Sequence, residues 1–428
     1  MKVITIKKQD KILKGRLALP SSKSISNRLL IIRAMAPADF SIHNLSESAD
    51  TVLLQKLFVK IALDTGSQHD VMLDAGNAGT VMRFLTAYLA FQPGTWNLGC
   101  SERMKERPVS ELVKALRSLG AEIDYLSVPG YPPLMIKGKK PTGNQVTIDP
   151  GISSQFISSL LMTGATIPGG LSLYLKGNAV SYPYIDMTIR IMDYFGVKVT
   201  PLLTPTPEGE GSPGFFVPCK SYIPRPFTVE SDWSAAAFWY EAAALANEVD
   251  LVLEGLQPNS IQGDSMLSAI FRNLGVQTVF TDEGVHLTKI KKNLNCFYFD
   301  FINYPDIAPA VITTCALLGL QGRFVGLKSL KIKESDRVNV LRKHFEKLGM
   351  HLEPSSVNDP EPVIEFAPSA LKLPAGYTIE SYGDHRIAMA FAPAALKLGS
   401  IRIEDPDVVS KSYPKYWEHM NMLGFEIS

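Results

Sequence analysis

The sequence predicts an α/β protein built from six repeated units, which divide into two pseudo-symmetric domains of three units each. Two interleaved helical patterns, each followed by a strand-like run, lead to this prediction. One pattern is amphipathic and ends in an apolar residue plus glycine, and the other is apolar on nearly every side. An amphipathic helix covers a surface and a wholly apolar one is buried, so a unit should contain one of each.

The first element of the chain is a strand by pattern. Residues 1–15 alternate apolar and polar side chains in the manner of a half-buried strand. The same stretch has no apolar run of about 7 to 15 residues, so it does not resemble a signal peptide. The longest apolar runs of the chain fall short of the about 18 residues that suggest a membrane span. We therefore expect a soluble, cytoplasmic protein.

The buried helices follow, and each leads into a strand candidate. Their starts are 73 to 81 residues apart, except that the first interval is 56 residues, so the first unit lacks roughly one hairpin. Turn chemistry around Pro224 and Pro226 indicates the crossing between two groups of three units. An uninterrupted solenoid is the alternative that the repeat leaves open. The predicted starts are Ser24, Thr80, Ser153, Ser234, Ala308 and His385.

The amphipathic helices share the same period. Their apolar residues recur at helical spacing, for example at Leu112, Leu116 and Leu119. The glycine after each copy supplies the left-handed residue that ends a helix, and successive copies are 74 to 79 residues apart. The five stop glycines are Gly120, Gly196, Gly275, Gly349 and Gly424.

Composition limits the classes of partner. The 428 residues carry 43 Lys and Arg against 42 Asp and Glu, so no global basic field attracts nucleic acid or a membrane surface. The four cysteines lie far apart without a CxxC pair, and the seven histidines form no HExxH motif. We expect reduced cysteines, no metal site and no nucleic-acid partner.

The starts of the buried helices combine small polar residues with cations. Arg28 and Arg83 follow the first two starts, Asp306 precedes the fifth, and Gly383 to Arg386 surround the sixth. Helix amino termini present free N–H groups and partial positive charge, so several of them facing one cleft would bind an anionic small molecule. Each polar residue taken singly, Asp306 included, could instead be an ordinary N-cap.

Two basic clusters precede amphipathic helices in corresponding units of the two halves. They comprise Arg103 to Pro108 and Lys331 to Arg337, and Lys411 adds a cation near the carboxyl terminus. A charge run is usually a solvated face, but the matching arginines suggest a cleft lined from both domains. Glu334 adds a carboxylate among the cations, which proton transfer requires.

Cofactor motifs are weak. Gly209 to Gly214 satisfies GxGxxG literally, but its prolines and the lack of a following helix predict a loop instead of a dinucleotide site. No Walker A motif and no GxSxG nucleophile elbow occurs. We therefore expect no cofactor.

Six segments taken together resemble the EPSP synthase family of enolpyruvyl transferases, over about Leu19 to Phe425. The resemblance implies an inside-out α/β barrel fold, with two domains of three βαβαββ units whose helices are buried. It further implies a substrate-binding domain at 21–227 and a second domain made of residues 1–20 plus 228–428. The segments are KSISNR, GNAGTVMR, RMKERP, SSQ, KESDR and GDHRIAMAFA.

The same resemblance implies the activity. The family transfers the enolpyruvyl group of phosphoenolpyruvate to the 5-hydroxyl of shikimate 3-phosphate, on the route to chorismate and aromatic amino acids, without a cofactor or metal. Both substrates carry a phosphate and a carboxylate, so only converging Arg and Lys side chains could hold them together. We expect these small anions as partners, no membrane, and a monomer.

Residue by residue, the resemblance assigns Asp306 as the base and Glu334 with Lys23 as proton-transfer partners. The implied contacts to shikimate 3-phosphate are Lys23, Ser24, Arg28, Ser153, Ser154, Gln155, Ser181, Tyr184, Asp306, Ser329 and Lys333. The implied contacts to phosphoenolpyruvate are Lys23, Asn77, Gly79, Arg107, Gln155, Arg337, His385, Arg386 and Lys411.

The chain departs from the family pattern at a few positions. Ser329 stands where an Asn is usual, and Phe84 follows Arg83 where many members have Pro. Pro20-Ser21-Ser22 replaces the common Pro-Gly before the lysine.

Two other functions compete with this interpretation. The sister family that adds enolpyruvate to UDP-N-acetylglucosamine uses a loop cysteine close before an Arg-Pro pair, whereas Cys100 lies seven residues before Arg107. A catalytically silent, anion-binding repeat protein would be expected to lack some of Asp306, Glu334 and Lys411, and all three are present.

Overall fold

The structure is a computed structural model that describes residues 2–64, 70–204, 212–292, 294–353, 361–369 and 371–428. The chain forms two compact units. Unit 1 comprises residues 1–22, 47–49 and 230–428, and unit 2 comprises residues 23–46 and 50–229. None of the helices in the described ranges combines the length and the hydropathy that crossing a membrane requires.

Unit 2 contains three open sheets, with strand orders β4-β5-β7-β6, β10-β11-β9-β8 and β12-β3. Its helices are α1 (Lys23–Met35), α2 (Ala49–Asp64), α3 (Gly79–Leu89), α4 (Glu102–Lys105), α5 (Ser110–Ser118), α6 (Ser154–Gly164) and α7 (Tyr182–Tyr194). Its strands are β3 (Ile42–His43), β4 (Val71–Asp74), β5 (Gly94–Gly99), β6 (Glu122–Tyr125), β7 (Leu134–Gly138), β8 (Gln145–Ile148), β9 (Leu171–Leu175), β10 (Thr200–Thr204), β11 (Ser212–Val217) and β12 (Phe227–Thr228).

Unit 1 also contains three sheets, with orders β14-β15-β13-β2, β16-β17-β18 and β19-β1-β20. Its α-helices are α8 (Trp233–Leu245), α9 (Leu267–Asn273), α10 (Ala308–Leu317), α11 (Arg337–Lys347), α12 (His385–Phe391), α13 (Ala395–Leu398) and α14 (Tyr416–Met422). Its 3₁₀ helices are η1 (Gly263–Met266), η2 (Lys328–Ile332), η3 (Ala392–Ala394) and η4 (Pro406–Lys411). Its strands are β1 (Val3–Lys7), β2 (Ile12–Ala18), β13 (Glu248–Glu254), β14 (Val276–Thr281), β15 (Gly284–Lys289), β16 (Cys296–Asp300), β17 (Gln321–Val325), β18 (Ile364–Phe366), β19 (Ser400–Glu404) and β20 (Glu426–Ile427).

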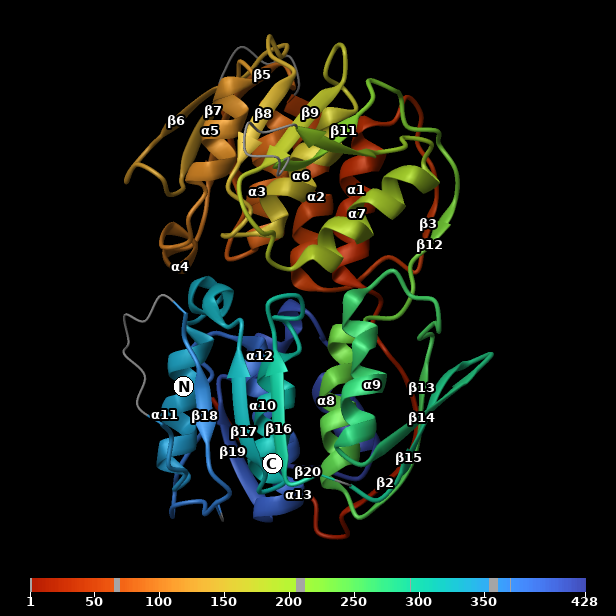
Figure 1. Ribbon diagram of the computed structural model, residues 1–428, viewed down its shortest axis with the longest axis vertical. Helices are drawn as coiled ribbons and strands as arrows, with labels where there is room; N and C mark the ends of the chain where they lie inside the picture. Colours follow the sequence, from red (N-terminus) through yellow and green to blue (C-terminus); the bar gives the residue numbers. More distant parts are fainter. Residues whose placement is uncertain (1, 65–69, 205–211, 293, 354–360, 370) are drawn as a thin grey trace. The chain divides into compact units, whose positions relative to one another are not determined.

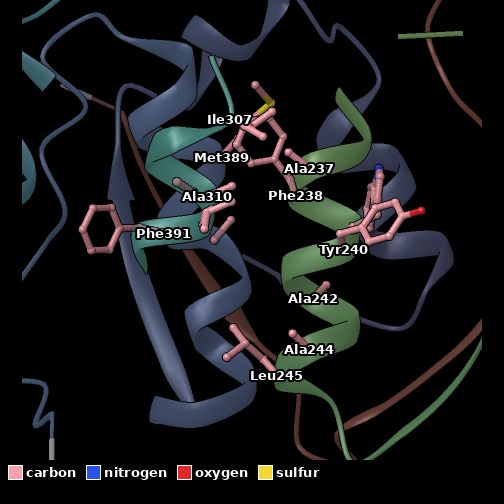
Figure 2. Packing of buried hydrophobic residues seen from close by; sticks show 14 of the residues in the cluster. Ala237, Phe238, Tyr240, Ala242, Ala244, Leu245, Ile307, Ala310, Met389 and Phe391 are labelled. Atoms are coloured by element: carbon pink, nitrogen blue, oxygen red, sulfur yellow. The ribbon is translucent and has the colours of Figure 1, made fainter. Parts of the chain in front are cut away.

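Each unit has its helical core inside and its sheets outside. In unit 2 the helices α1, α3 and α6 contact one another, and in unit 1 the helices α8, α10 and α12 do so. Many of the strands alternate buried and exposed residues, so one face of each such strand covers these helices. Figure 1 shows α8 beside α10, and Figure 2 shows Phe238 of α8 directed toward Ile307 and Met389. The predicted α/β class is confirmed.

The buried helices start where the sequence predicts, to within one residue. The six helices are α1, α3, α6, α8, α10 and α12, and all six strand candidates that follow them form strands. Short polar N-caps explain the agreement for α6 and α8, since Ser153 and Asp232 each accept a backbone N–H at the start of their helix. The five stop glycines all have φ between 80° and 97°, which is the left-handed end predicted for them.

Three local expectations differ from the structure. Sequence periodicity missed α2, because α2 is not followed by the apolar-glycine pair of its sisters. The sixth apolar stretch is divided into α12, η3 and α13, since Pro393 interrupts the helical hydrogen bonds. Of the GxGxxG segment, residues 209–211 lie outside the described residues, and Ser212 to Gly214 belong to strand β11 instead of the predicted loop.

Candidate active site

Arg28 lies on α1 in unit 2, and its side chain is almost completely buried. Its Nε donates to Thr188 Oγ1 at 2.7 Å, and its Nη1 donates to the Ser24 carbonyl at 2.8 Å. Its Nη2 donates to Ser158 Oγ and to the Tyr184 carbonyl, both at 3.1 Å. Because these partners are neutral, burial lowers the pKa of Arg28 to about 10. The Arg28 guanidinium is therefore a buried cation that has hydrogen-bond partners. Because these partners are neutral, they do not neutralise its charge.

Phe84 of α3 completes the surroundings of Arg28. The guanidinium carbon lies 5.4 Å from the centroid of the Phe84 ring, a cation–π contact. Phe84 is the residue that stands where many family members have Pro, and it is fully buried. The departure noted in the sequence therefore touches the residue expected to hold the sugar phosphate.

Lys23 begins α1, and Ser181 lies just before α7. Lys23 Nζ is 3.0 Å from Asp50 Oδ2, and both side chains are largely buried. Ser181 adopts the left-handed conformation with φ of 55°. The carbonyl of Tyr184 contacts Arg28 one turn further along α7. The predicted residues Lys23, Ser24, Arg28, Ser181 and Tyr184 thus belong to unit 2.

Two guanidinium groups lie at the amino end of α3. A Cβ atom at Gly79 would come within 2.6 Å of Arg83 Nη1 and 2.7 Å of Arg107 Nη2. A side chain at this position would displace both guanidinium groups. Arg107 is 3% exposed, and its Nη1 is 3.5 Å from the carbonyl of Asn77. A helix amino terminus with two adjacent arginines has the charge and the N–H groups that an anion needs.

The amino end of α6 adjoins this cation pair. Gln155 Oε1 accepts from Arg83 Nη1 at 2.8 Å. Ser153 caps α6, accepting from the backbone N–H of Gln155 at 3.3 Å, and Ser154 is the first helical residue. The N-cap role that the sequence left open for Ser153 is thus present.

Arg337, the first residue of α11 in unit 1, is held by carboxylates. Its Nε is 2.8 Å from Asp384 Oδ2 and its Nη2 is 3.2 Å from Asp384 Oδ1. The same Nη2 lies 2.8 Å from Glu334 Oε2, and Nη1 lies 3.5 Å from Asp306 Oδ1. Burial alone would lower the pKa of Arg337, but the carboxylates outweigh it and raise the pKa above its usual range.

Asp306 is surrounded by cations. Its Oδ2 is 3.0 Å from Arg386 Nη2, and its Oδ1 is 3.5 Å from both Lys333 Nζ and Arg337 Nη1. Burial on its own would raise the pKa of Asp306. The three cations outweigh this effect, so the pKa lies well below its usual range. Helix α10 begins at Ala308 with Ile307 at the N-cap position, so Asp306 does not occupy the N-cap.

The charges of unit 1 form one connected network. Glu334 bridges Arg337 and Lys411, whose Nζ is 3.3 Å from Glu334 Oε1. His385 is buried, and its Nδ1 lies 4.0 Å from Asp384 Oδ1. Ser329 is buried on η2. The network members are Asp306, Lys333, Glu334, Arg337, Asp384, Arg386 and Lys411.

The candidate residues therefore fall into two sets. Unit 2 provides cations and helix amino ends, and unit 1 provides carboxylates paired with cations. Of the three catalytic candidates, Lys23 belongs to the first set, and Asp306 and Glu334 belong to the second. Among the described residues no group of three or more His, Cys, Asp and Glu side chains has the arrangement of a metal site.

Asp384 is the main residue that sequence reasoning left out. It is fully buried, accepts from Ser335 Oγ at 3.0 Å, and caps α12 through the backbone N–H of Arg386 at 3.0 Å. The signal was available, because Asp384 precedes a buried helix in the position of an N-cap. Its contact with Arg337 was not, since the two residues are 47 positions apart.

The family model for EPSP synthase (3-phosphoshikimate 1-carboxyvinyltransferase) matches residues 7–420. A 3-phosphoshikimate 1-carboxyvinyltransferase from Bacteroides fragilis is 43% identical over 418 residues, covering 97% of this chain and 96% of that protein. One from Photobacterium damsela subsp. piscicida is 34% identical, covering 96% of this chain and 97% of that protein.

Solved structures agree with the sequence matches. A structure of EPSP synthase from Acinetobacter baumannii superposes with a TM-score of 0.75 at 26% identity, covering all of both chains. With the family model matched from the first strand of unit 1 to the last helix, and with relatives above 30% identity along almost the whole length, this chain belongs to the EPSP synthase family.

Proposed function

We propose that this chain transfers the enolpyruvyl group of phosphoenolpyruvate to the 5-hydroxyl of shikimate 3-phosphate and releases phosphate. Family membership supports the reaction, and one observation carries its assignment to these residues. That observation is the network of unit 1, in which Asp306 and Glu334 alternate with buried cations. Addition followed by elimination needs carboxylates for proton transfer and cations for anionic substrates in the same site.

The two sets of residues have different tasks in this proposal. The buried Arg28, with its uncompensated charge, binds the phosphorylated acceptor together with Ser24, Ser181 and Tyr184. Arg337, Arg386 and Lys411 of unit 1 bind the donor, along with Arg107 of unit 2. Ser329 and His385 stay predicted contacts to acceptor and donor, as do the domain limits 21–227 and 228–428.

Asp306 accepts the proton of the 5-hydroxyl. Beside Arg386, Lys333 and Arg337 its pKa is too low for a good base, because these cations stabilise the carboxylate. Substrate phosphates and carboxylates compete for those cations, so binding weakens the stabilisation and raises the pKa of Asp306 toward a useful value. Glu334 and Lys23 then complete proton delivery to and from the enol carbon.

A phosphate-release assay tests the function. Purified protein with phosphoenolpyruvate should release phosphate in the presence of shikimate 3-phosphate and none with UDP-N-acetylglucosamine. If phosphate is released only when UDP-N-acetylglucosamine is the acceptor, the protein has the sister activity. If neither acceptor leads to release, a silent anion-binding protein is favoured. We also expect a monomer in the cytoplasm, which sedimentation velocity and cell fractionation test.

A further inference from the structure

Tyr382 has an unusual backbone conformation two residues before Asp384. Its φ is 52°, and the next residue, Gly383, has φ of 66°. The N–H of Asp384 donates to the carbonyl of Ser381 at 2.9 Å. Positive φ at both central residues is the pattern of a type I′ turn, where Asn and Gly are favoured. A tyrosine at the first central position is strained, and such strain often marks a functional site.

Side chains of α11 hold this tyrosine in place. Lys343 Nζ contacts the Tyr382 hydroxyl and lies 4.7 Å from the centroid of its ring. The ring of His344, next along the same helix, is 6.2 Å from that of Tyr382. His344 also hydrogen-bonds the Tyr377 hydroxyl at 2.7 Å and the Glu380 carbonyl at 3.0 Å. Helix α11 therefore contacts both the side chain of Tyr382 and the backbone just before the turn, at the Glu380 carbonyl.

The same helix carries Arg337 at its amino end. Arg337 and Lys343 are six residues apart, which is about 9 Å along a helix. The segment from Glu380 to Asp384 thus touches α11 at two separate levels: Asp384 at Arg337, and Glu380 with Tyr382 at Lys343 and His344. These contacts connect the segment to α11 at two levels of the helix and add to the packing of its buried residues.

We propose that Tyr382 is a positioning residue, held in the strained turn by α11, that fixes Asp384 and through it the guanidinium of Arg337. The inference rests on the proposed function, in which Arg337 binds the donor. This positioning role explains why the bulky Tyr382 occupies a backbone conformation in which Asn or Gly would be unstrained. Lys343 is about half exposed, so its contact alone is weak, and the ring and hydroxyl of Tyr382 act together.

Replacement of Tyr382 by Asn separates strain from positioning. Asn-Gly is the preferred pair for a type I′ turn, so Tyr382→Asn removes ring and hydroxyl while the backbone conformation stays accessible. We expect the melting temperature of this variant to be unchanged or raised. Its KM for phosphoenolpyruvate should be about 5- to 20-fold higher and its kcat lower, so that kcat/KM falls by about tenfold or more. The KM for shikimate 3-phosphate should rise less than that for phosphoenolpyruvate, because most of its predicted contacts, Arg28 among them, belong to unit 2.

Two further variants complete the test. Tyr382→Phe keeps the ring and should recover most of the donor KM. Lys11 has the same φ of 52° at the β1–β2 turn of the same unit, so Lys11→Asn relieves comparable strain away from the site. It should leave all kinetic constants unchanged. A Tyr382→Asn enzyme with wild-type kinetics, or one whose two KM values rise together, would overturn the proposal.

Hydrogen exchange gives a readout that needs no substrate. If Tyr382 fixes the turn, the amide of Asp384 should exchange at least threefold faster in Tyr382→Asn, while amides of α8 keep their protection. Faster exchange in a protein that releases no phosphate with either acceptor would refute the proposed function and leave the positioning role standing. Unchanged exchange would refute the positioning role.

Discussion

Two buried arginines, one in each unit, are held by opposite means. Arg28 of unit 2 donates to hydroxyls and carbonyls and stacks on Phe84, and among the described residues no carboxylate contacts it. Arg337 of unit 1 contacts three carboxylates, those of Asp384, Glu334 and Asp306. Burial consequently lowers the pKa of Arg28, whereas ion pairing raises that of Arg337.

The difference indicates which part of the reaction each unit serves. A cation with neutral ligands retains its attraction for an external anion, so Arg28 is suited to ground-state binding of a phosphate. A cation inside a carboxylate network changes its partners when substrate arrives, so Arg337 is coupled to the proton affinity of Asp306. In our proposal unit 2 therefore provides mainly binding groups, with Lys23 as its proton-transfer residue, and unit 1 provides both carboxylates of the proton chemistry.

The largest expected effect comes from the carboxylate at the centre of the unit 1 network. Asp306→Asn cannot accept a proton, so kcat should fall by about 10²- to 10⁴-fold. The variant also leaves Arg386, Lys333 and Arg337 with one carboxylate fewer, so its melting temperature should fall as well. Single-turnover phosphate release and thermal unfolding measure the two effects.

Ligand addition separates stability from catalysis in that variant. Saturating phosphoenolpyruvate should restore the melting temperature of Asp306→Asn, because the bound anion compensates Arg337 and Arg386, but turnover with both substrates should stay low. A rate within threefold of wild type would remove Asp306 from the mechanism and leave Glu334 and Lys23 as candidate bases.

The second prediction tests the two arginines directly. Arg337→Met should reduce the free energy of unfolding by about 3–5 kcal/mol, because it leaves the buried Asp384 without its cation. Arg28→Met should cost no more than about 1–2 kcal/mol, because it removes a buried charge and leaves only neutral groups unpaired. Urea unfolding without ligands at neutral pH gives both values.

Kinetics of the same pair should differ in kind. Arg28→Met should raise the KM for shikimate 3-phosphate more than it lowers kcat, as expected for uniform binding. Arg337→Met should impair both the donor KM and kcat. Equal losses of stability in the two variants, or a normal turnover in Arg337→Met, would contradict the contrast between the units.

Local sequence signals predicted the helices well, and they did not predict the contacts between them. The start of α6 was predicted because a short polar cap precedes an apolar run, and both are neighbours in the chain. The stacking of Arg28 on Phe84 depends on how α1 packs against α3, and no local pattern encodes that packing. The predicted site residues came from motifs. The sequence also places Asp384 before the sixth buried helix, but its contact with Arg337 is visible only in the structure.

Among the described residues, Glu241 of α8 has neither the neutral hydrogen-bond partners of Arg28 nor the oppositely charged partners of Arg337. It is fully buried, and among the described residues its carboxylate oxygens have no hydrogen-bond partner. Burial therefore raises its pKa well above the usual value, and Cys315 and Tyr416 are the titratable groups that interact with it. The neutral acid is the form that the core accommodates.

The sign of the pH dependence follows from that raised pKa. Below the pKa of the unfolded state Glu241 is protonated in both states and costs nothing. As pH rises, the unfolded state ionises first and is favoured, so stability falls until the pH passes the folded pKa. Glu241→Gln should therefore match wild type at pH 4 and be more stable by about 1–3 kcal/mol at pH 8. Urea unfolding at both pH values measures this, and an equal effect at both would mean that Glu241 does not titrate across that range.

The smallest predicted effect concerns Phe84, whose uncharged ring lies beside the Arg28 guanidinium. Phe84→Leu removes the ring and retains an apolar, helix-compatible side chain that still covers Arg28, so it should raise the KM for shikimate 3-phosphate by about two- to fivefold, equivalent to about 0.5–1 kcal/mol of binding free energy. Phe156→Leu is the matched control, because Phe156 is equally buried and its ring lies 5.3 Å from the guanidinium of Arg83.

The control distinguishes a specific contact from general loosening of the core of unit 2. Both substitutions remove a buried ring and should lower the melting temperature by similar amounts. If neutral stacking supports the charge of Arg28, Phe84→Leu should raise the acceptor KM more than Phe156→Leu does, because Phe156 contacts Arg83, which is not among the predicted acceptor contacts. Equal changes of the acceptor KM in both variants would show that packing alone is responsible, and Arg28 would then depend only on its hydrogen bonds.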